Sequence, residues 1–385
     1  MSIKKDTGKG KKKVLVGLSG GVDSAVAACL LKRQGYDVTG VYMRFWASGG
    51  GEKPDKSPVN KCCTIEALNK AIHIAKKIRI PLLILDFKRQ FKKKVVDPFI
   101  NDSGNRLTPN PCIECNRSIK FGLFLEKMKQ LKADFVATGH YARVKKSGRG
   151  GYELYAATDK LKDQSYFLHT LTREKLRRIL FPLGDMKKSR VRLLARKFGL
   201  DEINDQKESQ NLCFLPGDET EPFLRKHLKN KKAISPGPIL TTSGLSIGRH
   251  RGLPFYTIGQ RKRLGIGGIR NLPDQHGNPW YVINYDAKKN ALVVGHDSDL
   301  YTRRVCARNL TFVGGRAPGT ARRVTAKIRY GAAARPAVLK IIAAGSGGGA
   351  QTAEIIFKSG QRAVTPGQSI VFYDGAKVLG GGIIA

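Results

Sequence analysis

Three of the seven cysteines in this sequence lie where sulfur chemistry is favoured. Cys112 and Cys115 form a C-x-x-C in a proline-punctuated loop that leads into an expected helix, and Cys213 lies far along the chain. The N-terminus of a helix stabilises a thiolate, so a thiol beside it is a better nucleophile near neutral pH. A zinc half-site would also contain C-x-x-C. Because the sequence has no second C-x-x-C or C-x-x-H, a closed zinc site is disfavoured.

The segment Ser19-Gly20-Gly21-Val22-Asp23-Ser24 follows an apolar run and precedes residues at helical spacing. In a strand, turn and helix of this kind, the backbone N–H groups of the turn and of the helix N-terminus point to one place, which favours an anion. A Walker A loop would need a lysine followed by serine or threonine, and the hexapeptide lacks that pair. It instead resembles the PP-loop of ATP pyrophosphatases, which cleave ATP between the α- and β-phosphates. A glycine-rich turn without a ligand is the structural alternative.

The elements that must position these residues alternate between apolar β-type runs and segments of helical periodicity. The expected strands are residues 14–18, 38–43, 82–85 and 135–138, and the expected helices include residues 65–78 and 118–131. This alternation predicts an α/β domain built on a parallel sheet with helices on its faces. We expect Ser189 to cap a further helix whose apolar face includes Val191 and Leu194.

The second half of the chain has a different pattern. Residues 229–238 are basic and rich in proline and glycine, which is typical of a domain boundary. From Trp280 onward short β-type runs alternate with turns, which predicts a small β-barrel. The predicted organisation is a basic, disordered arm over residues 1–13, a PP-loop catalytic domain over 14–220, a small central domain over 221–285 and a C-terminal β-barrel over 286–385.

Charge and composition indicate a partner class. The 385 residues include 70 Lys plus Arg and 30 Asp plus Glu, a formal net charge of +40 that attracts polyanions such as nucleic acid. A generally basic proteome is the alternative explanation of this charge. The lysine-rich N-terminus has no apolar segment of a secretory signal, and no apolar run is long enough to cross a bilayer. We therefore expect a cytoplasmic protein with reduced thiols and no membrane partner.

Several longer segments, in their order along the chain, resemble the tRNA-specific 2-thiouridylase family of the PP-loop ATP pyrophosphatase superfamily. The resemblance extends over nearly the whole chain. The segments that carry it are residues 19–24, the Pro-Cys-x-x-Cys-Asn loop at 111–116, Ala137-Thr138-Gly139-His140-Tyr141, residues 162–167, Cys213, residues 257–262, residues 265–268, residues 365–369 and the terminal Gly380-Gly381-Gly382-Ile383-Ile384.

The resemblance implies an enzyme that binds the anticodon arm of tRNA and uses ATP, with Mg²⁺, to replace the C2 oxygen of the wobble uridine by sulfur. It implies that ATP is bound by Gly17, Leu18, Ser19, Gly20, Gly21, Val22, Asp23, Ser24, Met43 and Gly139. It implies that the target base lies against Asn110, Pro111 and Cys112, and that tRNA is contacted by His140, Lys162, Asp163, Gln164, Arg329, Tyr330 and Gln368.

In the same family Cys115 corresponds to the nucleophile and Cys213 to the cysteine that carries a persulfide. The chemistry is consistent with these roles, because adenylation converts a poor leaving oxygen into AMP and a sulfur nucleophile can then attack C2. Attack of Cys115 on the persulfide would release the sulfur and leave a transient Cys115–Cys213 disulfide. The sulfur would come from an upstream donor protein or from sulfide.

One position departs from the family pattern, since many members carry aspartate where this chain has Cys112. An aspartate contact to the base therefore cannot be transferred. Three thiolates, Cys112, Cys115 and Cys213, could instead ligate a [4Fe–4S] cluster with one iron open to sulfide, which we carry as a hypothesis.

Two other functions fit parts of the sequence. A PP-loop ligase or amidotransferase that adenylates a carboxylate or amide would not need Cys115 and Cys213. A non-enzymatic RNA-binding protein with a vestigial nucleotide site would explain the charge but would release neither AMP nor pyrophosphate.

Overall fold

The computed structural model describes residues 10–47, 64–148, 150–201, 212–215, 220–266, 278–317, 319–342 and 351–385. Most of the predicted basic arm, residues 1–9, lies outside this part of the chain. The chain divides into two compact units. Unit 1 comprises Met1–Lys92 and Glu114–Pro216, and unit 2 comprises Lys93–Ile113 and Gly217–Ala385. Residues 93–113, inside the predicted 14–220 domain, are thus grouped with the second unit.

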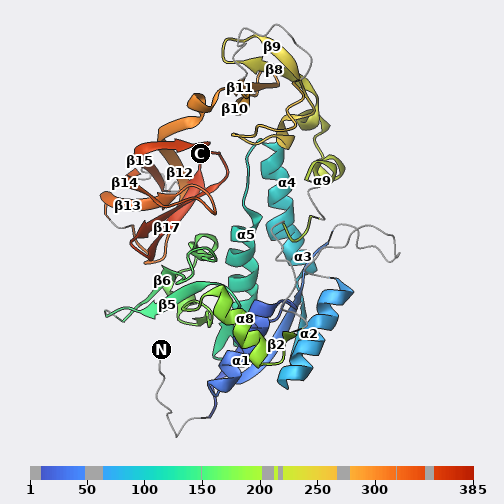
Figure 1. Ribbon diagram of the computed structural model, residues 1–385, viewed down its shortest axis with the longest axis vertical. Helices are drawn as coiled ribbons and strands as arrows, with labels where there is room; N and C mark the ends of the chain where they lie inside the picture. The colour runs from blue at the N-terminus through green and yellow to red at the C-terminus, as the bar shows by residue number, and fades with distance from the viewer. Residues whose placement is uncertain are drawn as a thin grey trace. The chain divides into compact units, whose positions relative to one another are not determined.

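Unit 1 contains a five-stranded sheet in the order β3-β2-β1-β4-β7, in which every neighbouring pair is parallel (Figure 1). Its strands are β1 (Lys13–Gly17), β2 (Asp37–Arg44), β3 (Leu82–Asp86), β4 (Phe135–Ala137) and β7 (Ile179–Leu180). Its helical segments are α1 (Val22–Arg33), α2 (Ile65–Ile78), α3 (Lys88–Phe91), η2 (Cys115–Leu123), α6 (Phe124–Gln130), η3 (Ser165–Leu168), α7 (Arg173–Leu176) and α8 (Lys188–Lys197). A hairpin of β5 (Ala142–Lys146) and β6 (Tyr152–Ala156) completes it. The predicted α/β class is confirmed.

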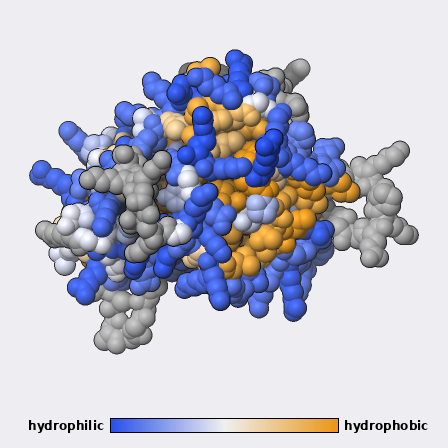
Figure 2. Space-filling model, turned by 90° about the horizontal axis from the view of Figure 1, so that it is seen from below, coloured by the Kyte–Doolittle hydropathy of each residue, from blue (hydrophilic) through white to orange (hydrophobic). Residues whose placement is uncertain are grey.

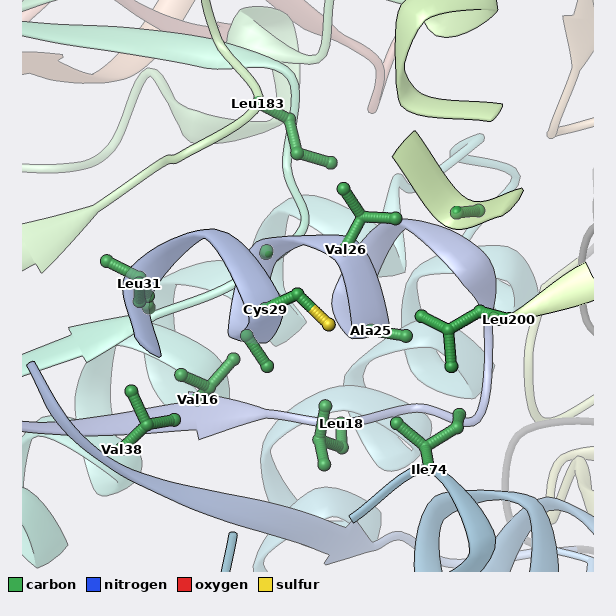
Figure 3. Packing of buried hydrophobic residues seen from close by; sticks show 14 of the residues in the cluster. Val16, Leu18, Ala25, Val26, Cys29, Leu31, Val38, Ile74, Leu183 and Leu200 are labelled. Carbon is green, nitrogen blue, oxygen red and sulfur yellow. The ribbon is translucent and has the colours of Figure 1, made fainter. Parts of the chain in front are cut away.

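The core of unit 1 is centred on α1, which packs against β1, β2, α2 and α8. Figure 3 shows Val26 and Cys29 of α1 above Val16 and Leu18, with Ile74 nearby. β1 is buried on both faces from its second residue onward, as expected for a strand inside a parallel sheet. Cys29 is 8% exposed, and burial raises the pKa of its thiol to about 11. It is therefore a packing residue, as the apolar helix face predicted.

Unit 2 contains two β-structures. A four-stranded sheet in the order β10-β11-β8-β9 surrounds a core that includes Ile239, Ile247 and Leu292. Strands β12 to β17 pair in the order β12-β15-β14-β13-β16-β17, and β12 also pairs with β17, which closes a barrel. This confirms the predicted C-terminal β-barrel.

The helical segments of the second half of the fold are η1 (Lys92–Val96), α4 (Asp97–Gly104), α5 (Pro111–Glu114), α9 (Thr220–His227), η5 (Lys231–Ile234), η6 (Leu253–Phe255) and η7 (Asp297–Leu300). Its strands are β8 (Gly237–Thr241), β9 (Ser246–His250), β10 (Tyr281–Asp286), β11 (Ala291–Gly295), β12 (Tyr301–Phe312), β13 (Ala321–Lys327), β14 (Arg335–Ile342), β15 (Thr352–Arg362), β16 (Ser369–Asp374) and β17 (Lys377–Ile384).

The surface is not uniformly charged, despite the net charge of +40. The face in Figure 2 carries an apolar area bordered by hydrophilic side chains. On the edge strand β3, Leu83 and Ile84 are 37% and 49% exposed. Within the described part of the chain, no helix has the length and apolar content needed to span a bilayer.

Candidate active site

The PP-loop is the turn between β1 and α1. Gly20 has a φ of +81°, a conformation that glycine adopts readily, and a Cβ there would lie 3.0 Å from the carbonyl oxygen of Ala67. The Ser24 hydroxyl accepts a hydrogen bond from the backbone N–H of Ser19 at 3.2 Å and donates one to the Gly21 carbonyl at 2.9 Å. Gly21 is the N-cap of α1, and none of the described side chains caps it. This turn therefore leaves helix N–H groups available to an anion.

Two glycines bring distant segments against this turn. A Cβ on Gly139 would lie 2.8 Å from the backbone carbon of Asp23 and 2.8 Å from the nitrogen of Ser24, so only glycine permits this approach. A Cβ on Gly17 would lie 3.1 Å from Cε of Met43. The structure therefore brings together three segments from which we predicted ATP-binding residues: residues 17–24, Met43 and Gly139.

A lysine that the sequence analysis did not assign to the site joins the PP-loop. Nζ of Lys188 lies 2.7 Å from each carboxylate oxygen of Asp23, and the Tyr141 hydroxyl donates to Asp23 Oδ1 at 2.7 Å. The Lys188 side chain is only 9% exposed. Asp23 and Lys188 are 165 residues apart, and no spacing rule connects positions so distant.

The predicted cap of α8 is wrong. The helix begins at Lys188 after an extended N-cap at Lys187, which makes no side-chain cap hydrogen bond. The backbone N–H of Lys188 instead donates to Oδ2 of Asp159 at 2.8 Å. A carboxylate from another segment thus accepts the first N–H of the helix, and Ser189 lies exposed within the first turn.

His140 follows Gly139 and has a neutral, partly buried ring. Its Nδ1 lies 2.8 Å from Oγ1 of Thr138, and the ring contacts those of Phe121 and Phe181. Burial lowers the pKa of His140 well below its usual range, and the nearby charge of Lys120 lowers it further. At neutral pH the imidazole can therefore form hydrogen bonds or stack but carries no charge for a phosphate.

Of the adjacent residues 162–164, Asp163 is the most buried. Its carboxylate accepts hydrogen bonds from the N–H of Ala157 at 3.0 Å, from the N–H of Ser165 at 3.1 Å and from the Ser165 hydroxyl at 2.9 Å. Oε1 of Gln164 accepts the N–H of Tyr141 at 3.0 Å. These contacts fix the loop that presents Lys162, whose side chain is partly exposed.

The cysteines differ in exposure. Cys115 is the first residue of η2 and is 7% exposed, Cys213 is partly exposed and Cys112 is exposed. The ring of Phe214, beside Cys213, lies 6.0 Å from that of Phe91 in α3, and α3 packs on η2. Two predicted reactive cysteines, Cys115 and Cys213, therefore belong to segments linked through α3 within unit 1.

Asn116, next to Cys115, was not predicted as a site residue. It is 3% exposed, and its Nδ2 donates to the carbonyl oxygen of Phe167 at 3.2 Å. This contact ties the start of η2 to the segment that follows residues 162–164. Its Oδ1 is buried with no hydrogen-bond partner among the described residues.

The predicted base-binding residues Asn110, Pro111 and Cys112 belong to unit 2. Nε2 of Gln368 donates to the carbonyl oxygen of Thr108 at 2.9 Å, and the N–H of Thr108 donates to the Pro366 carbonyl at 2.9 Å. The turn at residues 365–368 thus holds the start of the loop that contains the base-binding residues. Elsewhere in unit 2, Arg329 donates to the Arg362 carbonyl at 3.4 Å and Tyr330 is 45% exposed.

A metal cluster would need several donor side chains gathered at one place. Among the described residues, no group of three or more His, Cys, Asp or Glu side chains is placed to hold a metal ion. Cys112 belongs to unit 2, whereas Cys115 and Cys213 belong to unit 1. We assign no step to a cluster.

Three family models match successive parts of the chain. They are described as a tRNA methyl transferase HUP domain over residues 12–217, a tRNA methyl transferase PRC-barrel domain over residues 221–296 and an aminomethyltransferase β-barrel domain over residues 302–384. A solved structure of a 4-thiouridine synthetase–RNA complex with bound ATP is similar with a TM-score of 0.32 and 16% identity, covering 56% of this chain and 49% of the other, which is too low to support an argument.

Curated relatives are much more similar. The tRNA-specific 2-thiouridylase MnmA of Clostridioides difficile is 41% identical over 97% of this chain and 98% of its own length. The protein of the same name from Symbiobacterium thermophilum is 44% identical over 97% of this chain and 92% of its own, and that from Carboxydothermus hydrogenoformans is 41% identical over 97% and 98%. With this identity over almost its whole length, the chain belongs to the tRNA-specific 2-thiouridylase family.

Proposed function

We propose that this protein is a sulfurtransferase that uses ATP to replace the C2 oxygen of the wobble uridine of tRNA by sulfur, releasing AMP and pyrophosphate. The observation that carries the proposal is the PP-loop with its uncapped helix N-terminus, in a chain 41% identical to an enzyme named tRNA-specific 2-thiouridylase. Gly139 lies so near this loop that a Cβ on it would be 2.8 Å from backbone atoms of Asp23 and Ser24. The net charge of +40 supports a polyanionic substrate.

The first step is adenylation. The N-terminus of α1 and the glycine-rich turn before it would hold the phosphates of ATP through backbone N–H groups, with Mg²⁺ sharing their charge. The uridine O2 attacks the α-phosphorus as the bond to the β-phosphate oxygen breaks, and pyrophosphate leaves. Met43 and Gly139, beside the turn, are proposed to border the nucleotide.

The second step is sulfur transfer. Cys213 would receive a sulfur atom from an upstream donor protein and carry it as a persulfide. The Cys115 thiolate attacks Sγ of Cys213, the S–S bond of the persulfide breaks, and hydrosulfide leaves as a Cys115–Cys213 disulfide forms. Hydrosulfide attacks C2 and displaces AMP. A thiol reductant then restores both cysteines for the next cycle.

The tRNA contacts are proposed residue by residue. Tyr330 is exposed and aromatic, so it can stack on a base, and Lys162 and Arg329 can contact phosphates. Asn110, Pro111 and Cys112 are proposed to receive the uridine, with His140 as an uncharged contact. We propose that Asp163, Gln164 and Gln368 act mainly by fixing the loops that their hydrogen bonds hold.

The experiment measures tRNA-dependent pyrophosphate release and tRNA thiolation in Cys115→Ala and Cys213→Ala, with Cys306→Ala, an exposed cysteine of β12, as the matched control. Sulfur is supplied either by a cysteine desulfurase or as free sulfide. We expect both variants to release pyrophosphate but to lose desulfurase-driven thiolation, whereas Cys306→Ala behaves as the unmodified protein. Free sulfide should partly restore thiolation in Cys213→Ala. Undiminished thiolation in both cysteine variants would contradict the proposed sulfur route.

The same assay separates the alternatives. A PP-loop ligase or amidotransferase would release pyrophosphate with a small acceptor and without tRNA, and an RNA-binding protein would release none. Iron content after anaerobic purification tests the cluster hypothesis, since a fully active iron-free protein would exclude it.

A further inference from the structure

The ion pair between Asp23 and Lys188 places a cation at the PP-loop. Asp23 is the second residue of α1, and its carboxylate receives Lys188 Nζ at 2.7 Å on both oxygens together with the Tyr141 hydroxyl at 2.7 Å. Lys188 Nζ also lies 5.8 Å from the centre of the Tyr141 ring. A carboxylate and an ammonium group thus meet beside the helix N-terminus that, on the proposed function on which this inference rests, holds the phosphates.

The position of Lys188 is set by the fold. Its backbone N–H is held by Asp159, and α8 packs on α1 through buried residues that include Val191 and Ala195. Figure 3 shows Val26 and Ala25 of α1 in the core that these helices share. Nζ is therefore directed at the PP-loop by contacts at both the start and the buried face of its helix.

A cation at this place suits the chemistry of the loop. Residues 19–24 contain no Lys or Arg, whereas a Walker A loop carries its own lysine for the phosphates. Asp23 adds negative charge where a triphosphate must bind, and unscreened like charges would oppose binding. A buried lysine at this place both balances Asp23 and offers N–H donors to a phosphate oxygen.

We propose that Lys188 is a phosphate-binding residue of this enzyme, which supplies from α8 the cation that the PP-loop lacks and stabilises pyrophosphate as it leaves. When the bond between the α-phosphorus and the bridging oxygen breaks, that oxygen takes the electron pair. The Lys188 side chain donates a hydrogen bond to the departing pyrophosphate, which gains negative charge in this step.

The test compares Lys188→Gln and Lys188→Arg with Lys187→Gln, the exposed lysine one residue earlier. For each protein we would measure the rate of single-turnover pyrophosphate release with saturating tRNA. The dissociation constant of a non-hydrolysable ATP analogue and the midpoint temperature of thermal unfolding complete the comparison. We expect Lys188→Gln to slow pyrophosphate release about 100-fold, the loss typical of removing one transition-state donor, with a smaller change in analogue affinity. Lys188→Arg should recover at least part of the rate, and Lys187→Gln should match the unmodified protein.

Lys188→Gln removes the cation that pairs with Asp23 and could unfold the protein. A second comparison therefore sets Asp23→Asn against the double variant Asp23→Asn, Lys188→Gln. The double variant has no unpaired charge, and we expect it to release pyrophosphate more slowly than Asp23→Asn alone. Equal rates in these two variants would show that Lys188 only neutralises Asp23 and would overturn the proposal. A folded Lys188→Gln protein with the unmodified rate would overturn it too. Neither result would affect the sulfur-transfer assays on Cys115 and Cys213.

Discussion

The side-chain amide of Gln368 donates a hydrogen bond of 2.9 Å to the backbone carbonyl oxygen of Thr108, a residue 260 positions earlier in the chain. Gly367, the residue before Gln368, has a φ of +89°, and a Cβ on it would lie 2.7 Å from the Thr108 nitrogen. The turn before β16 therefore supports the loop that leads to Asn110. Gln368 was predicted to contact tRNA, and this hydrogen bond supports a positioning role for it.

We predict that Gln368→Ala lowers the rate constant of thiolation about fivefold while the affinity for tRNA changes little. One lost hydrogen bond is worth about 1 kcal/mol, and it orients the base-binding loop rather than the tRNA backbone. Single-turnover thiolation and tRNA binding are measured in parallel, with Gln351→Ala at an exposed position as the control. A loss of tRNA affinity with an unchanged rate constant would instead assign Gln368 to direct tRNA binding.

We predict that His169 makes the fold sensitive to acid. Its ring is 3% exposed and Nδ1 donates to the Tyr166 carbonyl at 2.9 Å. Burial, aided by the charge of Arg117, lowers the pKa of His169 from 6.5 to about 4. Between these values the unfolded chain binds more protons, so stability falls as pH drops from 6.5 towards 4, by about 3 kcal/mol in total.

The measurement is the free energy of unfolding, obtained from urea denaturation at several pH values. His169→Gln should flatten the stability profile over this range, whereas His73→Gln at an exposed position of α2 should leave it unchanged. An equally steep profile in His169→Gln would show that other groups cause the acid sensitivity.

We predict that Asp163→Asn destabilises the protein by about 1–3 kcal/mol, because an amide nitrogen cannot accept the hydrogen bonds that the carboxylate now receives from Ala157 and Ser165. Chemical denaturation gives the free energy of unfolding. Asp185→Asn, at an exposed carboxylate 3.7 Å from Arg143, should change it by less than about 1 kcal/mol. If Asp163→Asn retained full stability but lost tRNA binding, the carboxylate would be a direct RNA contact.

We predict that Gly139→Ala disrupts the nucleotide site. The added methyl group would lie 2.8 Å from backbone atoms of Asp23 and Ser24, so the PP-loop must move, at a cost of about 1–3 kcal/mol. Affinity for a non-hydrolysable ATP analogue should fall about tenfold or more. Gly148→Ala, where a Cβ meets no atom within 4 Å, is the control. Unchanged nucleotide affinity in Gly139→Ala would remove Gly139 from the ATP site.

Local patterns predicted the elements well, and contacts between distant segments were predicted poorly. The helix expected over residues 65–78 is present with those bounds, and Cys29 is buried as its place on an apolar helix face indicated. The ion pair between Lys188 and Asp23 depends on how α8 packs on α1, and no spacing of residues in the sequence predicts that packing. Ser189 was a reasonable cap by residue type, but Asp159 binds the N–H of Lys188 from outside the helix.

The most direct test of the account is mass spectrometry of nucleosides from tRNA incubated with the protein, ATP, Mg²⁺ and a desulfurase supplied with heavy-sulfur cysteine. The account predicts one heavy sulfur in place of one oxygen at the wobble uridine, dependent on ATP and on Cys213, and none in a tRNA with cytidine at that position. Thiolation that proceeds without ATP, or a wobble uridine that stays unmodified while ATP and persulfide are both consumed, would contradict it.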